Sequence, residues 1–334
     1  MPTSAETPAL RVAQWRIALA LAAVYVVWGS TYLAMRVSIE TLPPLTAAGL
    51  RYLAAGGLVY GWARWRGAPP ASARHWRSAA VIGALLLLAG NGGVMWAEQQ
   101  VPSGLAALVI STEPLWIVLL VWMRRGGRRP SSRVAIGLVI GFAGLALLVR
   151  PSAGNGLPLA GTVVLAVASV CWAAGSVYSQ RAPLPASPLL ATGIQMLCGG
   201  ALLFLAGAVA GEPARFAVAA VSSRSVLALL YLIVFGSMVA FTCYSWLLRV
   251  ASPVLVSTYA YVNPVIAVFL GWALAHEPIT SGTLLAAAVI LAGVVLITTA
   301  EATRARRPAP HRPQPSTIPT HPAEELVEAE TCPR

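Results

Sequence analysis

The chain has 334 residues, of which 57% are hydrophobic and only 10% are charged, and its formal net charge is +12. A water-soluble domain has about a quarter of its residues charged, so this composition excludes one and indicates a protein that crosses a membrane many times. Runs such as ALLLLAG (84–90) are apolar on every face. They exclude the alternating pattern of an outer-membrane barrel.

Ten apolar stretches follow one another along the chain, each near the roughly 20 residues that a helical span requires. Arg11 and Arg16 stand at the start of the first stretch, which is too long for a signal peptide and lacks a small-residue cleavage site, so we interpret it as a retained span. We therefore predict an all-α membrane protein with ten transmembrane helices. The stretches cover residues 16–35, 45–63, 78–97, 104–123, 133–150, 158–178, 188–210, 226–247, 254–273 and 281–300.

The basic residues predict the orientation of these spans. All 23 are arginine, and with the N-terminus in the cytoplasm 18 of them lie on the cytoplasmic side, which is what the positive-inside rule requires. Both termini are then cytoplasmic, residues 1–15 as a short N-terminal segment and residues 301–334 as a disordered tail rich in proline and charge. The net charge is explained by the orientation of the spans in the membrane and implies no nucleic-acid partner.

The two halves of the chain resemble each other at an offset near 150 residues. Trp96 aligns with Trp246 and Trp122 with Trp272, and GSTY (29–32) echoes GSVY (175–178). Each half has five spans, and because five is odd the second half enters the membrane from the opposite side. We predict two inverted five-helix repeats, residues 16–150 and 151–300. This arrangement is typical of secondary transporters, whose site lies between the halves.

A proline with a polar neighbour interrupts the same span in both halves, as Glu113-Pro114 and as Asn263-Pro264. Matched interruptions of this kind point to a binding site, because the freed backbone and the polar group face a cavity rather than lipid. The alternative is that Pro114 and Pro264 are packing kinks and that Glu113 is paired with an arginine.

Arg51 is the basic residue that falls within a span. It is interpreted either as a fixed cation for a substrate carboxylate or for Glu113, or as a side chain that snorkels to the outer interface. Further polar or aromatic side chains in the spans are candidates for lining the pocket, although each hydroxyl could instead bond a carbonyl of its own helix. These are Trp28, Ser30, Thr31, Tyr32, Asn91, Trp172, Ser176, Tyr178, Tyr244, Tyr259, Tyr261 and Asn263.

Motifs for other chemistries are missing from the sequence. It contains no GxxxxGK[ST] phosphate loop, no HExxH, and no histidine in a predicted span. The four cysteines show no metal or redox spacing. We therefore expect no cofactor, no metal site and no direct use of ATP.

Several long segments resemble the EamA family of the drug/metabolite transporter superfamily, and within it the YedA-like group of inner-membrane permeases. The resemblance covers residues 16–300 and implies ten helices in two inverted EamA repeats, a bacterial inner membrane, and outward transport of small metabolites such as amino acids. Glu277, in the loop after the ninth stretch, is interpreted as structural. The segments are WGSTYLAMRVSIETLPPLTAAGLRYLAAGGL (28–58), GNGGVMWAEQQVPSGLAAL (90–108), CWAAGSVYSQRAPLP (171–185) and STYAYVNPVIAVFLGWALAHEPIT (257–280).

These observations predict a secondary transporter of a small amino-acid-like metabolite, an exporter that works by alternating access. Its partners are the solute and the lipid bilayer, and a homodimer is left open. Coupling is to protons or by exchange, and Glu113 is the candidate proton-linked group, because burial raises the affinity of a carboxylate for protons. The rival hypothesis is an intramembrane enzyme acting on a lipid substrate, which requires a cluster of acids or histidines.

Overall fold

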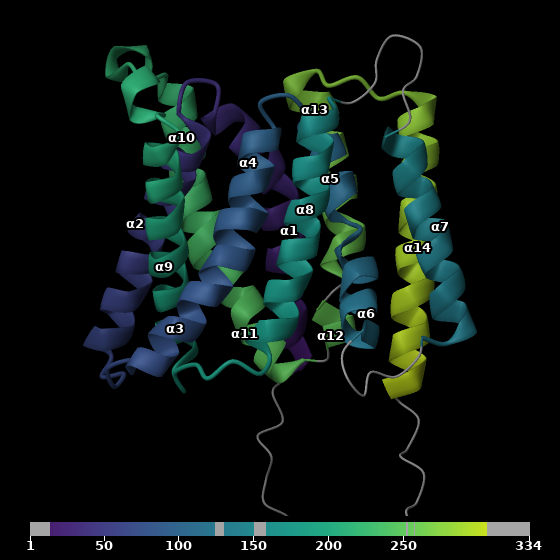
Figure 1. The fold of residues 1–334 in the computed structure, drawn as a ribbon, viewed down its shortest axis with the longest axis horizontal. Coiled ribbons are helices and arrows are strands. Elements are labelled where there is room, and N and C mark those ends of the chain that lie inside the picture. The colour runs from purple at the N-terminus through teal and green to yellow at the C-terminus, as the bar shows by residue number, and fades with distance from the viewer. Residues whose placement is uncertain (1–13, 124–129, 150–157, 252, 257, 306–334) are drawn as a thin grey trace, which may run out of the picture.

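The computed structural model describes residues 14–123, 130–149, 158–251, 253–256 and 258–305, and within these ranges every regular element is a helix (Figure 1). Residues 1–13 of the N-terminal segment and residues 306–334 of the predicted disordered tail lie outside the described residues. The first helix begins at Gln14, and the last helix continues to Ala305, beyond the predicted boundary at residue 300. Seven helical segments are long and apolar enough to cross a membrane, and residues 132–148 and 262–275 form shorter apolar helices. The all-α membrane fold is confirmed.

The first half contains α1 (Gln14–Ser38), α2 (Pro44–Trp65), α3 (Ala73–Ile82), η1 (Gly83–Gly92), α4 (Gly93–Ala97), α5 (Ser103–Ile110), α6 (Glu113–Met123) and α7 (Ser132–Val149). The second half contains α8 (Leu159–Ser179), α9 (Pro188–Val209), the short η2 (Pro213–Arg215) and η3 (Val218–Ala220), α10 (Ser223–Tyr231), η4 (Leu232–Phe241), α11 (Thr242–Val250), α12 (Pro253–Val256), α13 (Tyr259–Ala275) and α14 (Ser281–Ala305). In Figure 1 these helices run up and down in one bundle. We call the end where α1 begins the lower end, and α14 also ends there.

Two helical segments are wound as π-helix, and they occupy equivalent places in the two halves. The first, η1, begins at Gly83 and continues α3 into α4, and the second, η4, begins 149 residues later at Leu232 and continues α10 into α11. π-Helical turns are rare and frequently mark functional sites. Their recurrence supports the internal repeat, and it is independent of the residue matches between the two halves.

The two matched prolines lie in different local structures. In the first half the chain turns at Ser111 and Thr112, Glu113 opens α6, and Pro114 stands in the first helical turn, where its missing N–H is not needed. In the second half the break between α12 and α13 comes earlier in the chain, and Pro264 lies inside α13. The same dipeptide position therefore starts a helix in one half and sits within a helix in the other.

Carboxylates from the second half hold the first turns of two helices of the first half at the upper end. Glu212 accepts the backbone N–H and the hydroxyl of Thr46 in α2, both at 2.7 Å. Glu277 accepts the backbone N–H and the hydroxyl of Ser103 in α5, both at 2.8 Å, and the N–H of Gly104 at 3.1 Å. A negative charge is stabilised at a helix N-terminus, so this geometry fits the structural interpretation of Glu277.

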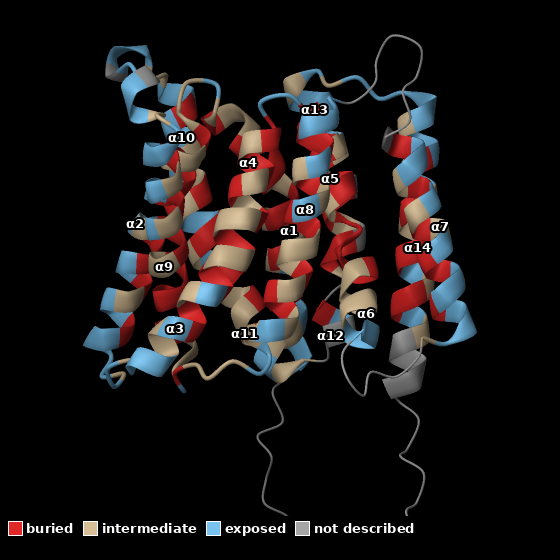
Figure 2. Cartoon of the chain, in the orientation of Figure 1, coloured by how far each residue is buried: buried red, intermediate tan, exposed pale blue. Residues whose placement is uncertain are grey.

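Glycines allow helices from different halves to touch backbone to backbone. A methyl group at Gly193 of α9 would lie 2.8 Å from the backbone nitrogen of Tyr60 in α2, and one at Gly293 of α14 would lie 2.6 Å from that of Gly141 in α7. Small residues permit such close helix packing in membranes. Figure 2 shows exposed residues on much of α7, among them Val139 at 70% exposure, and buried residues along α14 beside it.

The contact between α7 and α14 predicts a cost for any side chain at Gly293. We expect Gly293→Val to destabilise the protein by about 1–3 kcal/mol, because overpacking forces the helices apart. The measurement is the thermal midpoint of the detergent-solubilised protein by fluorescence-detected size-exclusion chromatography. Gly57→Val is the control, since a Cβ at Gly57 of α2 meets nothing within 4 Å. Equal midpoints for the two variants would show that α7 and α14 do not pack as described.

Candidate functional site

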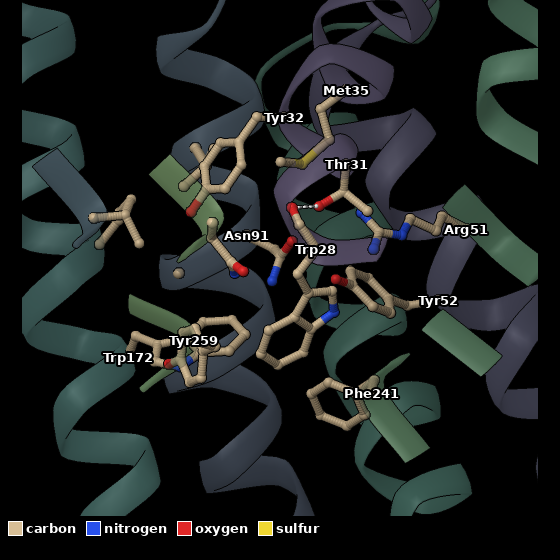
Figure 3. A pocket seen from close by; sticks show the side chains of 15 residues that line it. Trp28, Thr31, Tyr32, Met35, Arg51, Tyr52, Asn91, Trp172, Phe241 and Tyr259 are labelled. Atoms are coloured by element: carbon tan, nitrogen blue, oxygen red, sulfur yellow. Dashed lines mark hydrogen bonds between the residues drawn. The ribbon is translucent and has the colours of Figure 1, made fainter. Parts of the chain in front are cut away.

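A small pocket lies at the centre of the bundle, between residues from both halves (Figure 3). Its walls come from α1, α2, η1, α4 and α5 in the first half and from α8, η4 and α13 in the second, so both π-helical segments contribute. In Figure 3 Trp28 stands in the middle, with Arg51 and Tyr52 on one side and Trp172 and Tyr259 on the other. The free volume is about 50 Å³, well below the roughly 300–1,000 Å³ of sites for drug-sized ligands. The pocket is therefore largely filled by its own side chains.

Arg51 supplies a buried positive charge to this pocket. It is 2% exposed, its Nε–H donates to Ser237 Oγ at 2.7 Å, and its guanidinium lies 4.7 Å from the centre of the Tyr52 ring. Its Nη1 has no hydrogen-bond partner. Gly236 makes room for it, since a methyl group there would lie 2.8 Å from Nη2. This burial contradicts the snorkelling alternative and leaves the N–H donors of Nη1 free for a ligand.

Glu113 lies beside the pocket and is 2% exposed. The hydroxyl of Tyr259 donates to its Oε2, and Ser176 forms a further hydrogen bond with it. The Ser176 hydroxyl is also 3.0 Å from the hydroxyl of Tyr244. Within the described residues the ion-pair distance of 4 Å is met only by Arg224 and Glu40 at the upper end, so Glu113 is not paired with an arginine there.

Four aromatic rings form one side of the site. The ring centre of Trp28 lies 5.6 Å from that of Trp172, 4.9 Å from that of Tyr244 and 5.4 Å from that of Tyr259, mostly in edge-to-face arrangements. The Trp28 Nε1–H donates to the carbonyl of Gly236 at 3.2 Å, which ties α1 to η4. Such rings offer an apolar surface with polar tips and can also receive a cation.

Most of the side chains expected from the sequence meet at this pocket. The walls include Trp28, Thr31, Tyr32, Arg51, Asn91, Trp172, Tyr259 and Asn263. Glu113, Ser176 and Tyr244 join them through the hydrogen bonds and ring contacts above.

Two expected residues do not join this group, and a third cannot be placed. Ser30 turns away, with its hydroxyl 2.6 Å from that of Tyr231 on α10, and Tyr178 is 38% exposed. The side chain of Tyr261 lies outside what the structure describes. Ser30 and Thr31 both donate to carbonyls of α1, at 2.8 and 2.7 Å, as the alternative interpretation of the hydroxyls requires.

Asn263 connects α13 to α1. In the amide orientation that satisfies its hydrogen bonds, its side-chain nitrogen donates to the carbonyl of Tyr259 at 3.2 Å and to that of Tyr25 at 3.1 Å. It is 5% exposed. Asn263, at the position equivalent to Glu113, is thus a neutral side chain that donates hydrogen bonds to backbone carbonyls. Glu113 itself forms its hydrogen bonds with side chains.

Other residues of the site carried no signal in the sequence. Met35, Tyr52 and Phe241 line the pocket, and Ser237 holds Arg51. They sit in helices that are apolar on all sides, where no periodicity tells the inner face from the lipid face. Within the described residues no group of three His, Cys, Asp or Glu side chains could hold a metal ion.

Comparison with known proteins agrees with this architecture. The profile described as "EamA-like transporter family" matches residues 14–150 and again residues 159–299. The chain belongs to the EamA-like transporter family.

This EamA-like protein is 42% identical to the inner membrane transporter YedA of Escherichia coli strain K12, over 84% of its own length and 89% of that relative. It is 30% identical to the protein PecM of Dickeya dadantii, over 81% and 88% of the two chains. A solved crystal structure with 21% identity matches it with a TM-score of 0.60, over 87% of this chain and 99% of that one, and supports the fold alone. The family and its named transporters favour transport over the enzyme hypothesis.

Arg51 has no paired carboxylate in the part of the chain that the structure describes, and this predicts how its replacement changes the stability of the protein. A buried cation without a paired carboxylate is costly, and replacing buried charges by apolar groups of similar volume is often neutral or stabilising. We expect Arg51→Met to be at least as stable as the wild-type protein. Ser237→Ala keeps the charge but removes an acceptor, and we expect it to cost about 1–3 kcal/mol. The thermal midpoints of both variants and of the double mutant measure this. A marked loss of stability in Arg51→Met alone would show that the arginine is structural.

Proposed function

We propose that this protein is a secondary active transporter that moves a small amphipathic, carboxylate-bearing metabolite of amino-acid type out of the cell. The observation that carries the proposal is the free Nη1 donor of buried Arg51, placed in an aromatic pocket between the two halves. A carboxylate satisfies such a donor with a charge-assisted hydrogen bond. The rings of Trp28, Trp172 and Tyr259 would contact the apolar part of the solute, and Glu113 would face its positive or polar part.

The proposed topology is ten membrane spans in two inverted repeats, with the lower end of the bundle in the cytoplasm of a bacterium. The recurrence of a π-helical segment at equivalent positions supports the repeat. The helices α2 and α11 end at the lower end, and the arginines there support the orientation: Arg64 and Arg249 in their last turns and Arg66 directly after α2.

Cavities at both ends of the bundle support access from both sides. A cavity of about 470 Å³ near the lower end is lined by Gln195, Tyr244 and Arg249, and by Phe241, which also lines the central pocket. A second of about 450 Å³ at the upper end is lined by Arg36, Gln100 and Glu277. The two cavities would let a solute approach from either side, and the side chains that fill the central pocket would have to move apart to admit it.

Arg51 is expected to determine which solutes are transported. In proteoliposomes, Arg51→Met should lower the flux of carboxylate-bearing solutes about 10- to 100-fold, because a hydrogen bond to a charged group contributes about 1.5–3 kcal/mol. Decarboxylated amine analogues of the same solutes should lose much less. Tyr178→Phe, which alters a partly exposed residue outside the pocket, is the control. Equal losses for anionic and cationic solutes in Arg51→Met would count against the assignment.

Glu113 is proposed as the proton-linked group, with exchange of two solutes as the alternative form of coupling. Glutamine keeps the shape of the side chain and cannot titrate, so Glu113→Gln should flatten the dependence of flux on pH. Tyr259→Phe removes the hydrogen bond to Glu113 but leaves the carboxyl group, and it should retain a pH dependence. A pH profile in Glu113→Gln that matches the wild-type profile would refute the coupling role.

A further inference from the structure

Glu98 follows α4 at the upper end of the bundle and is completely buried, with 0% exposure. Neither oxygen of its carboxylate has a hydrogen-bond partner, whereas its backbone carbonyl accepts from Nη1 of Arg36. Buried polar side chains are nearly always paired, and an isolated ionised carboxylate is very costly to bury. The geometry therefore suits a neutral, protonated side chain.

Glu98 lies between the central pocket and the upper cavity. Val94, one helical turn before it, lines the central pocket, and Gln100, two residues after it, lines the upper cavity. Arg36, which bonds its carbonyl, also lines the upper cavity. Any opening of this end must move the segment that carries Glu98, so water that enters the cavity reaches its carboxyl group.

The charged groups around Glu98 come from three elements. Arg36 of α1 and Arg51 of α2 are positive, and Glu277, in the segment after α13, is negative and already bonded to the first turn of α5. The upper part of α8, residues 159–170, also packs near Glu98 and has no titratable side chain. The hydroxyl of Tyr32 is within the electrostatic reach of both Glu98 and Glu113.

Burial raises the pKa of Glu98 well above its ordinary value, and the negative charge of Glu277 adds to this effect, while Arg36 and Arg51 oppose it. If the pKa of a carboxyl group is higher when the group is buried, its protonation stabilises the closed arrangement. This stabilisation is complete at pH values below the pKa of the exposed group, near 4.3. That stabilisation is lost as the pH rises from there through the raised pKa. Acid therefore closes the upper end and alkali opens it.

We propose that Glu98 is a proton-binding site at the upper end, which must take up a proton from that side before the end can close. This inference rests on the proposed alternating access. In the open arrangement water solvates the Glu98 carboxylate, and protonation removes the charge that prevents its burial. This order of steps fits an exporter driven by inward proton movement: a proton is bound outside, the upper end closes, and the lower end becomes accessible.

The test measures accessibility at Val101, which is completely buried beside this segment. Val101→Cys is introduced into a chain whose four cysteines are changed to alanine, and its reaction with a membrane-impermeant maleimide is followed in lipid nanodiscs between pH 5 and pH 8. The rate is divided by that of Gln99→Cys, an exposed position, which removes the intrinsic pH dependence of thiols. We expect this ratio to rise by about tenfold or more, since one unit of pKa difference is a factor of ten.

In Glu98→Gln the ratio should stay at its low, acidic value at every pH. Glu277→Gln should raise the ratio at every pH, because it releases the first turn of α5. The ratio should still increase with pH in this variant. Glu98→Asp retains a carboxyl group and should keep the rise as well, which maintains the test if Glu98→Gln does not fold. A flat ratio in the protein with native Glu98, or an unchanged rise in Glu98→Gln, overturns the proposal. The assay contains no solute, so its result is separate from that of the flux measurements on Arg51 and Glu113.

Discussion

A guanidinium held away from water at the centre of the bundle is the constraint around which the site is arranged. Arg51 can be buried because Gly236 has no side chain, because Ser237 accepts one of its donors, and because the Tyr52 ring lies against its plane. Two of these features belong to η4, whose wider winding brings the backbone of the second half toward α2. The N–H donors of Nη1 have no hydrogen-bond partner among the described residues, so an anion bound in the pocket would offset more of the cost of the buried charge.

Both halves match the EamA-like family, but the ionisable groups of the site are divided unequally between them. The buried ionisable side chains Arg51, Glu98 and Glu113 all belong to the first half. The second half contributes neutral partners, since Ser237 accepts from Arg51 and Tyr259 donates to Glu113. A polar solute bound between the halves would therefore find its charged contacts in the first half and aromatic and hydroxyl contacts in both.

The sequence predicted an all-α membrane protein and many of the polar and aromatic side chains that line the central pocket, because apolar length, prolines and rare polar residues are strong signals in a membrane. It did not reveal the π-helical segments, since GALLLLAGNG and LIVFGSMVAF contain nothing that distinguishes i→i+5 from i→i+4 bonding. It gave no sign that Glu98, directly after the third predicted span, is buried by tertiary packing. Ser30 was expected beside Thr31 in the pocket, although neighbouring residues on a helix point about 100° apart.

The glycine contacts described above join α2 to α9 and α7 to α14, and each pair takes one helix from either half. If one repeat rocked as a rigid block against the other, both of these backbone contacts would have to shear at once. Helices in contact at this distance slide poorly, because interiors are close-packed and have few alternative arrangements. If the protein works by the proposed alternating access, each helix pair would therefore move as a unit, and the moving bodies would not coincide with the two halves of the chain.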